Sequence, residues 1–242
     1  MGRRRRRKVK NNINNFLIFL IVFLILSVVS YYVEPIRKNI PFFNESFENV
    51  DIPKSSGDLY KIMNNNIPEF KDSDYTTTSL EKYSDLDYLG RCGVAFANIS
   101  QEIMPKEGRE SISSVKPTGW QSVKYDIVDG KYLYNRCHLI GFQLAGENAN
   151  EKNLITCTRS MNTDGMLPFE DKVANYVKET NNHVLYRVTP VFDGNNLVAN
   201  GVQIEASSVE DHCGEICFNV FVFNTQDGII IDYKNGNSKL AN

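Results

Sequence analysis

A run of eighteen residues without a charged side chain, at 16–33, constrains this chain more than any other feature. At about 1.5 Å per residue, a helix of that length spans about 27 Å, close to the thickness of a bilayer's hydrocarbon core. Seven Lys and Arg residues precede the run. Because basic flanks stay in the cytoplasm, we expect a basic cytoplasmic N-terminus at 1–15, a single transmembrane anchor at 16–33 and an extracellular remainder.

The same segment has two other interpretations. Val28-Val29-Ser30 offers a small-residue cleavage site, so a signal peptide that is removed would leave a secreted protein instead of a single-pass protein of the cell membrane. The basic run alone is also typical of a nucleic-acid patch, but the apolar run that follows it directly favours the membrane.

Beyond residue 38 the chain is acidic, with 18 basic and 28 acidic side chains and a balance of −10. A protein that coats nucleic acid without specificity must neutralise many phosphates, so this balance argues against that class. Any binding of a polyanion must then depend on a few local cations or on a metal ion.

Residues 34–79 are rich in Asn, Ser, Asp and Pro, which predicts an extracellular stalk, and 80–242 then form the working domain. An α+β fold is indicated there, with an antiparallel central sheet and flanking helices. The predicted elements are strands at 92–97 and 217–224, hairpins at 123–134 (around Asp129-Gly130) and 184–206, and an amphipathic helix at 168–179.

Polar residues recur at a defined spacing after the first hairpin. The chain reads Asn135-Arg136-Cys137-His138, followed by Asn153, by Asn162 nine residues later and by Glu170 eight residues after that. This pattern resembles the DNA/RNA non-specific endonucleases, the ββα-metal or His-Me finger nucleases, which include bacterial DNA-entry nucleases and secreted DNases. Their signature begins Asp-Arg-Gly-His, so this chain departs from it at positions 135 and 137. The resemblance, which extends from about residue 89 to the C-terminus, implies the ββα-metal fold.

The resemblance also implies an activity: metal-dependent hydrolysis of phosphodiester bonds in DNA, and also in RNA, leaving 5′-phosphate ends. His138 would be the general base, since the pKa of histidine lies near the working pH. Asn153 would support and orient the site. Asn162 would bind Mg²⁺, with Mn²⁺ as a substitute, and Glu170 would hold a water of the ion.

Local cations would complete such a site. Arg136, Arg159 and Lys172 can supply a positive field for the phosphate within an otherwise acidic domain. Two plainer interpretations stay open, because Arg159 can be a solvated surface residue and because Asn162-Thr163-Asp164-Gly165 is a good turn sequence that needs no metal.

The sequence also offers two rival functions. Cys137 and His138 could form a thiol nucleophile and its base, but neighbours on a strand point to opposite faces of the sheet. The other rival is a membrane-tethered, extracellular nucleic-acid-binding or adhesion module with a vestigial site, for which the departures at Asn135 and Cys137 are the support.

Five cysteines in an extracellular domain predict one or two disulfides and a remaining thiol. Cys213 and Cys217 are the easiest pair, whereas the pairing among the other three is open. A zinc site formed by His212 with these two cysteines would lack a fourth ligand. His183 is expected at the surface.

Overall fold

The computed structural model describes residues 52–55 and 57–241. The predicted cytoplasmic N-terminus 1–15, the predicted anchor 16–33 and the first part of the predicted stalk, 34–51, lie outside the described residues. Within the described part of the chain, no helix combines the length and the apolar character that a membrane crossing requires.

The described residues form an α+β fold, as the sequence predicts. Its strands are β1 Tyr60–Ile62, β2 Leu80–Tyr83, β3 Ala95–Ile99, β4 Tyr134–His138, β5 Leu154–Thr158, β6 Val184–Val191, β7 Gly201–Ser208, β8 Cys217–Phe223, β9 Ile229–Asp232 and β10 Asn237–Leu240. Its helices are the short η1 Asn64–Asn66, η2 Asp72–Asp74 and η3 Glu151–Asn153, then α3 Phe142–Ala145, the π-helix η4 Met161–Met166 and α4 Leu167–Thr180.

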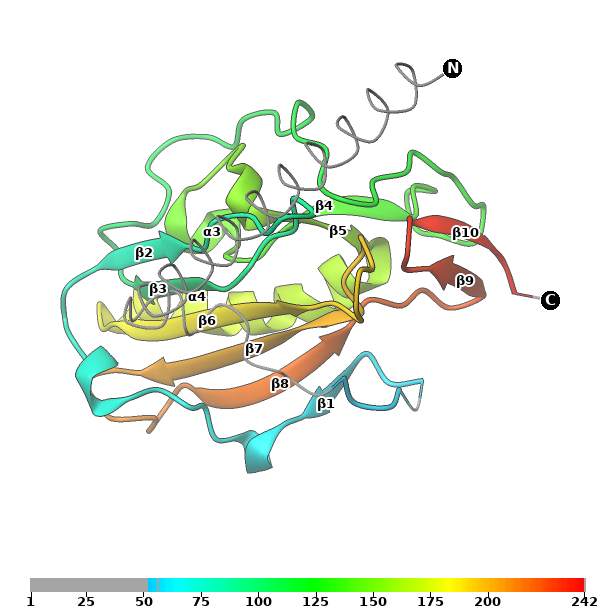
Figure 1. The fold of residues 1–242 in the computed structure, drawn as a ribbon. Coiled ribbons are helices and arrows are strands. Elements are labelled where there is room, and N and C mark those ends of the chain that lie inside the picture. The colour runs from blue at the N-terminus through cyan, green and yellow to red at the C-terminus, as the bar shows by residue number, and fades with distance from the viewer. Residues whose placement is uncertain (1–51, 56, 242) are drawn as a thin grey trace, which may run out of the picture. The chain divides into compact units, whose positions relative to one another are not determined.

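Six strands form one antiparallel sheet in the order β1-β8-β7-β6-β3-β2, and α4 runs along one of its faces (Figure 1). The predicted hairpin at 184–206 is confirmed by the pairing of β6 with β7 over eight residues each, and β8 confirms the strand predicted at 217–224. The helix predicted at 168–179 is α4. Val173, Ala174 and Val177 of α4 are buried in the main hydrophobic core together with side chains of the sheet.

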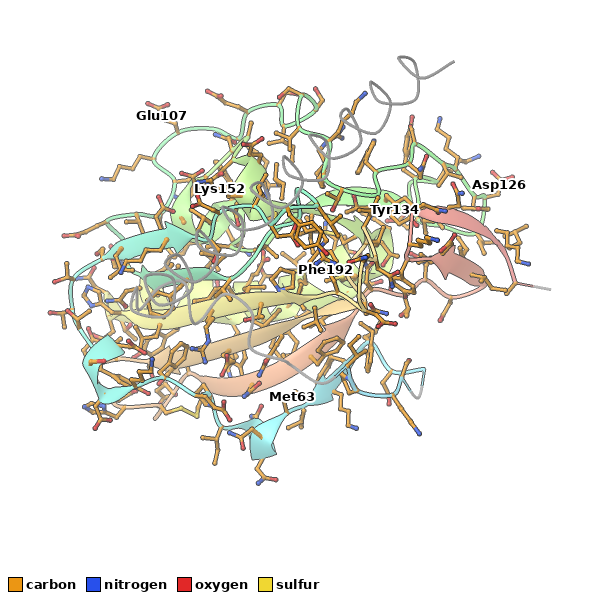
Figure 2. The ribbon with its side chains drawn as sticks, in the orientation of Figure 1. Met63, Glu107, Asp126, Tyr134, Lys152 and Phe192 are labelled. Carbon is orange, nitrogen blue, oxygen red and sulfur yellow. A yellow bond between two sulfur atoms is a disulfide. The ribbon has the colours of Figure 1, made fainter. Side chains whose placement is uncertain are left out.

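The strand pair β4–β5 and the helical segment that follows it form a ββα unit. Its register places His138 opposite Leu154 at one end and Tyr134 opposite Thr158 at the other. Figure 2 shows Tyr134 where β4 approaches the β9–β10 pair, and its hydroxyl donates a hydrogen bond of 2.9 Å to the carbonyl oxygen of Gly236 there. The unit therefore has a tyrosine end and a histidine end.

The first predicted hairpin is only partly present. The turn exists, since the Lys131 amide donates to the Val128 carbonyl oxygen at 2.8 Å, but a single bridge between Lys124 and Tyr132 replaces a ladder. Lys131 adopts a φ of 68°, which breaks the extended backbone. Because the chain from Tyr134 onward pairs with β5 instead, the regular strand begins later than the sequence predicts.

Part of the predicted stalk belongs to the sheet. β1 pairs with β8 in a register that places Ile62 opposite Val220, and the Glu69 amide donates to a carboxylate oxygen of Glu205 at 2.8 Å. The folded unit thus starts before Leu80. All three side chains of β1 are exposed, so no buried face marks this edge strand in the sequence.

Both disulfides join residues close in space. Cys213 bonds to Cys217, as predicted, and Cys137 bonds to Cys157 across β4 and β5. Cys92 is buried and free, and burial raises the pKa of its thiol to about 12. Its Sγ–H donates to the Leu154 carbonyl oxygen at 3.2 Å, so this cysteine is protonated and inert.

Candidate active site

His138 ends β4 and is only 8% exposed. Its Nε2 lies 2.9 Å from the main-chain carbonyl oxygen of Asn148. A carbonyl oxygen can only accept, so Nε2 carries the hydrogen and Nδ1 is the nitrogen that can accept a proton. Burial lowers the pKa of His138, and the hydrogen bond to Asn148 partly opposes this decrease. The imidazole is therefore neutral at pH 7 and has one basic nitrogen.

Asn153 supports the chain directly after His138. It is fully buried, its Oδ1 accepts from the Ile140 amide at 2.9 Å, and its Nδ2 donates to the Ile140 carbonyl oxygen at 3.0 Å. Both ends of the amide are thus occupied by main chain. The ring of His138 is oriented by the carbonyl of Asn148 instead, a group with no side-chain signature in the sequence.

Glu170 approaches the histidine end from the first turn of α4. Its carboxylate packs against Gly141, three residues after His138: a Cβ on Gly141 would lie 2.3 Å from Oε2. Burial raises the pKa of Glu170 to about 7, and hydrogen bonding from Gln143 opposes that rise. Only glycine leaves room for the carboxylate here.

Arg109 is a residue that the sequence did not identify. Its guanidinium lies over the ring of Phe142, 5.2 Å from the centroid. Its charge lowers the pKa of His138 and that of Glu170, so one cation is close to both groups. Arg109 belongs to the long irregular segment between β3 and β4, where neither periodicity nor a motif distinguishes it from its polar neighbours.

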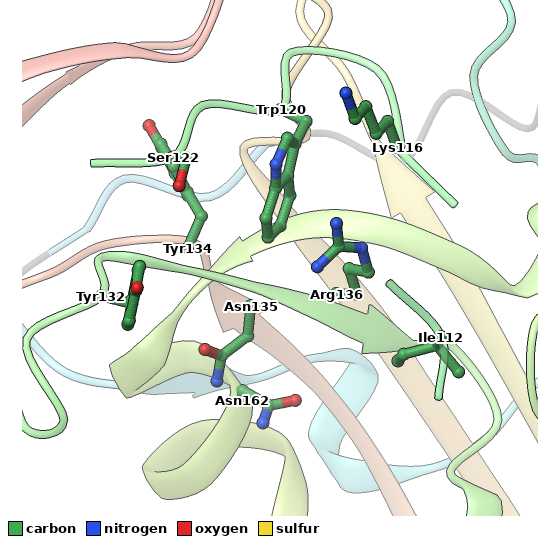
Figure 3. A pocket seen from close by; sticks show the side chains of 9 residues that line it. All are labelled: Ile112, Lys116, Trp120, Ser122, Tyr132, Tyr134, Asn135, Arg136 and Asn162. Atoms are coloured by element: carbon green, nitrogen blue, oxygen red, sulfur yellow. The ribbon is translucent and has the colours of Figure 1, made fainter. Parts of the chain in front are cut away.

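Asn162 is the second residue of the π-helix η4 and lies at the tyrosine end of the unit. This helix packs closely on the sheet at Gly165, where a Cβ would lie 2.5 Å from a methyl carbon of Val222. The Asn162 side chain makes no hydrogen bond to another described residue, and neither does that of Asn135. Figure 3 shows both amides at the same end of a cavity of about 800 Å³.

That cavity is lined by aromatic, amide and basic side chains. They are Ile112, Lys116, Trp120, Ser122, Tyr132, Tyr134, Asn135, Arg136 and Asn162. No acidic residue lines the cavity, although acidic side chains outnumber basic ones in the chain beyond residue 38. The cavity is thus locally suited to an anion.

One residue of this cavity, Asn162, also fits a hydrated, hard cation. The amide oxygen of Asn162 is a neutral hard donor of the kind that Mg²⁺ accepts while keeping most of its waters. Within the described residues, no group of three or more His, Cys, Asp and Glu side chains could hold a metal. The zinc site considered around His212 does not exist, because Cys213 and Cys217 are bonded to each other.

Arg136 anchors a loop over the cavity. Its Nε donates to the Val115 carbonyl oxygen, and a terminal nitrogen donates to that of Ser113 at 3.1 Å. The guanidinium also stacks on Trp120, 4.1 Å from the ring centroid. Arg136 lines the cavity, and two of its donors bind the main chain of residues 113 and 115.

The other predicted cations lie elsewhere. Arg159 forms an ion pair with Asp129 at 2.9 Å, and the Lys172 ammonium lies 5.9 Å from the ring of Phe218. Neither lines the cavity. Lys172 follows Glu170 by two residues, which turns it to another side of α4.

The structure places the predicted residues around one ββα unit. Asn162 and Arg136 line the cavity, whereas His138 and Glu170 do not line it and both lie near Arg109. The thiol dyad is excluded, because the sulfur of Cys137 is bonded to that of Cys157.

Comparisons with known proteins identify the family of this chain. Residues 71–210, more than half of the chain, match the family model described as DNA/RNA non-specific endonuclease. A curated relative, a deoxyribonuclease of Streptococcus dysgalactiae subsp. equisimilis, is 33% identical over 147 residues, which are 57% of this chain and 44% of that protein. The chain therefore spans less than half the length of this relative.

Two solved structures share the fold. NucA from Streptococcus agalactiae with a magnesium ion bound has a TM-score of 0.66 and 27% identity, over 74% of this chain and 86% of that one. Sda1 nuclease with a bound zinc ion has a TM-score of 0.60 and 28% identity, over 76% of this chain and 98% of that one.

Proposed function

Because this chain belongs to the DNA/RNA non-specific endonuclease family, we propose that it is a divalent-metal-dependent endonuclease that cleaves DNA, and also RNA. The observation that carries the proposal is the geometry of His138, whose Nε2 faces a carbonyl oxygen and so leaves Nδ1 to accept a proton. His138 lies in the same ββα unit as Asn162, whose amide makes no hydrogen bond within the described part of the chain. The deoxyribonuclease relative supports DNA as a substrate.

Phosphodiester hydrolysis requires a base for the attacking water and positive charge near the phosphate. His138 Nδ1 takes the proton from water, whose oxygen bonds to phosphorus as the bond to the 3′-oxygen breaks. The departing 3′-oxygen takes up a proton from solvent, so the products are a 3′-hydroxyl and a 5′-phosphate end. Arg109 contributes positive charge near His138, and Arg136 contributes it at the cavity. Asn153 holds the backbone after His138 and thereby keeps the imidazole in place.

Mg²⁺ is the proposed cofactor, with Mn²⁺ as a substitute. Asn162 would hold the ion through its amide oxygen, and Glu170 would orient its surrounding water. The ion would supply the positive charge that an acidic domain lacks. The magnesium in NucA and the zinc in Sda1 support a divalent cation.

The proposed location is the outer face of the cell membrane, with a single-pass anchor at 16–33 and the N-terminus in the cytoplasm. The two disulfides support export, because such bonds persist in oxidising compartments. Protease added to intact cells should then degrade the nuclease domain but spare a tag at the N-terminus. Release of the whole domain into the medium would favour the secreted alternative.

Digestion of supercoiled plasmid and of RNA by the full chain tests the activity. We expect nicking in Mg²⁺ that EDTA abolishes and that falls at least about 100-fold in His138→Ala and in Asn162→Ala. His212→Ala and Asn195→Ala are matched controls, since neither residue lines the cavity or contacts His138, and should retain the wild-type rate. Binding of DNA without cleavage would favour the tethered binding module, and cleavage that survives EDTA would exclude the metal.

A further inference from the structure

The cavity beside Asn162 holds more aromatic surface than phosphate hydrolysis requires. Tyr134 is buried and donates its hydroxyl to Gly236, so its role is structural. Trp120 is half-buried and Tyr132 is 48% exposed, and neither the indole N–H nor the Tyr132 hydroxyl bonds to another described residue. Two aromatic side chains with free polar groups therefore border the cavity (Figure 3).

A cation lies over each of these two rings. The guanidinium of Arg136 stacks on Trp120 at 4.1 Å, and the ammonium of Lys124 lies 4.4 Å from the ring centroid of Tyr132. Trp120 also packs against the small cluster formed by Val128, Leu133 and Tyr134. A fixed ring loses little conformational entropy when a flat group stacks on it.

The chemistry of the lining matches a nucleotide. Aromatic side chains and the positive charges of Lys116 and Arg136 border one space, and no acidic side chain lines it. At about 800 Å³ the space falls within the usual range for small-ligand pockets, so it can admit a base and its sugar. Aromatic faces bind any base by stacking, without reading its edge.

We propose that this cavity is a stacking site for an unpaired nucleobase, so that single-stranded or locally unpaired nucleic acid is the preferred substrate. The proposal deepens the proposed function, on which it rests for the identity of the ligand. A base inside a duplex is covered on both faces by its neighbours and cannot reach Trp120 or Tyr132, whereas an unpaired base can swing into the cavity.

Trp120 is the only tryptophan of the chain, so its fluorescence reports on this cavity alone. The full chain in EDTA is titrated with a short oligothymidylate, with an abasic oligomer of equal length and charge, and with a duplex of the same length. We expect oligothymidylate to quench the emission and to bind between about 5-fold and about 100-fold more tightly than the abasic oligomer. Equal quenching by the abasic oligomer or by the duplex would overturn the proposal.

Tyr132→Ala supplies a second measurement that leaves the reporter in place, with Tyr88→Ala as the matched control on an exposed tyrosine outside the cavity. We expect Tyr132→Ala to weaken oligothymidylate binding by about 10-fold with abasic binding unchanged, and Tyr88→Ala to change neither. Melting curves verify that both variants fold. An equal loss for both oligomers in Tyr132→Ala would show that the ring does not stack on a base.

The failures of the two proposals are distinguishable. If plasmid is cleaved in Mg²⁺ but the titrations show no preference for oligothymidylate, the stacking site is refuted and the nuclease stands. If oligothymidylate quenches Trp120 but no cleavage occurs, the base-binding site stands and the nuclease is refuted.

Discussion

Gly141 lies where the turn after β4 passes the first turn of α4, and its missing side chain makes room for the carboxylate of Glu170. A Cβ at this position would lie 2.3 Å from Oε2 and 2.7 Å from Cδ, whereas ordinary contact begins at 3.4 Å. In Gly141→Ala the carboxylate must therefore move by about 1 Å. The backbone itself is unstrained by the change, because φ −56° and ψ 145° suit any residue.

The size of the effect on rate follows from this displacement. A misplacement of about 1 Å at a reacting centre costs about 100-fold in rate. Overpacking usually destabilises a protein by about 1–3 kcal/mol, and we expect the lower end because the new methyl group meets the end of a flexible side chain. Gly141→Ala should therefore remain folded while its nicking rate falls by about 100-fold.

Initial rates of plasmid nicking at saturating Mg²⁺, together with melting temperatures, measure both quantities. Gly108→Ala is the matched control, since no atom lies within 4 Å of a Cβ there. If the carboxylate is the cause, Gly141→Ala should add no further loss to a Glu170→Ala protein. A folded Gly141→Ala that keeps half of the wild-type rate, or losses that add in the double variant, would refute the reasoning.

Three further predictions concern stability. Burial raises the pKa of Glu170 from 4.5 to about 7, so the carboxyl group loses its proton at a lower pH in the unfolded chain than in the folded one. The free energy of unfolding should therefore fall as pH rises between these values. Denaturant unfolding in EDTA should show this slope in wild type and not in Glu170→Gln. Asn153→Asp replaces the amide that donates to the Ile140 carbonyl oxygen with a buried carboxylate oxygen, and it should lower the free energy of unfolding by about 3 kcal/mol. An unchanged midpoint in urea unfolding would contradict the observed hydrogen bonds. Replacing Cys137 and Cys157 by serine removes a disulfide between residues 20 apart and should lower the free energy of unfolding by about 3 kcal/mol. Removing the Cys213–Cys217 disulfide, which joins residues four apart, should lower it by about 2 kcal/mol. The reverse order in denaturant titrations would contradict this prediction.

Local pattern was enough to predict most regular elements. The helix α4 and the hairpin of β6 and β7 were predicted because apolar residues recur at the helical or strand period and turn residues separate them. The pairing of Cys213 with Cys217 followed from their closeness in the chain. β1 was missed because an exposed edge strand carries no apolar face.

The candidate site was predictable only as a list of side chains. The spacing of His138, Asn162 and Glu170 identified the family, since motif spacing is a property of the chain itself. Tertiary packing decides whether a predicted cation faces the site or pairs elsewhere. Arg159, for example, forms an ion pair with Asp129 and does not line the cavity.

What the sequence determined by itself is the order of elements, the family and the residue types available for hydrolysis, because periodicity and spacing are local. Tertiary structure alone decided that the Asn148 carbonyl selects the tautomer of His138, that Arg109 lies near both His138 and Glu170, and that Arg136 holds a loop against Trp120. A main-chain carbonyl is identical at every position, and a charge acts across space, so the folded chain is what places both.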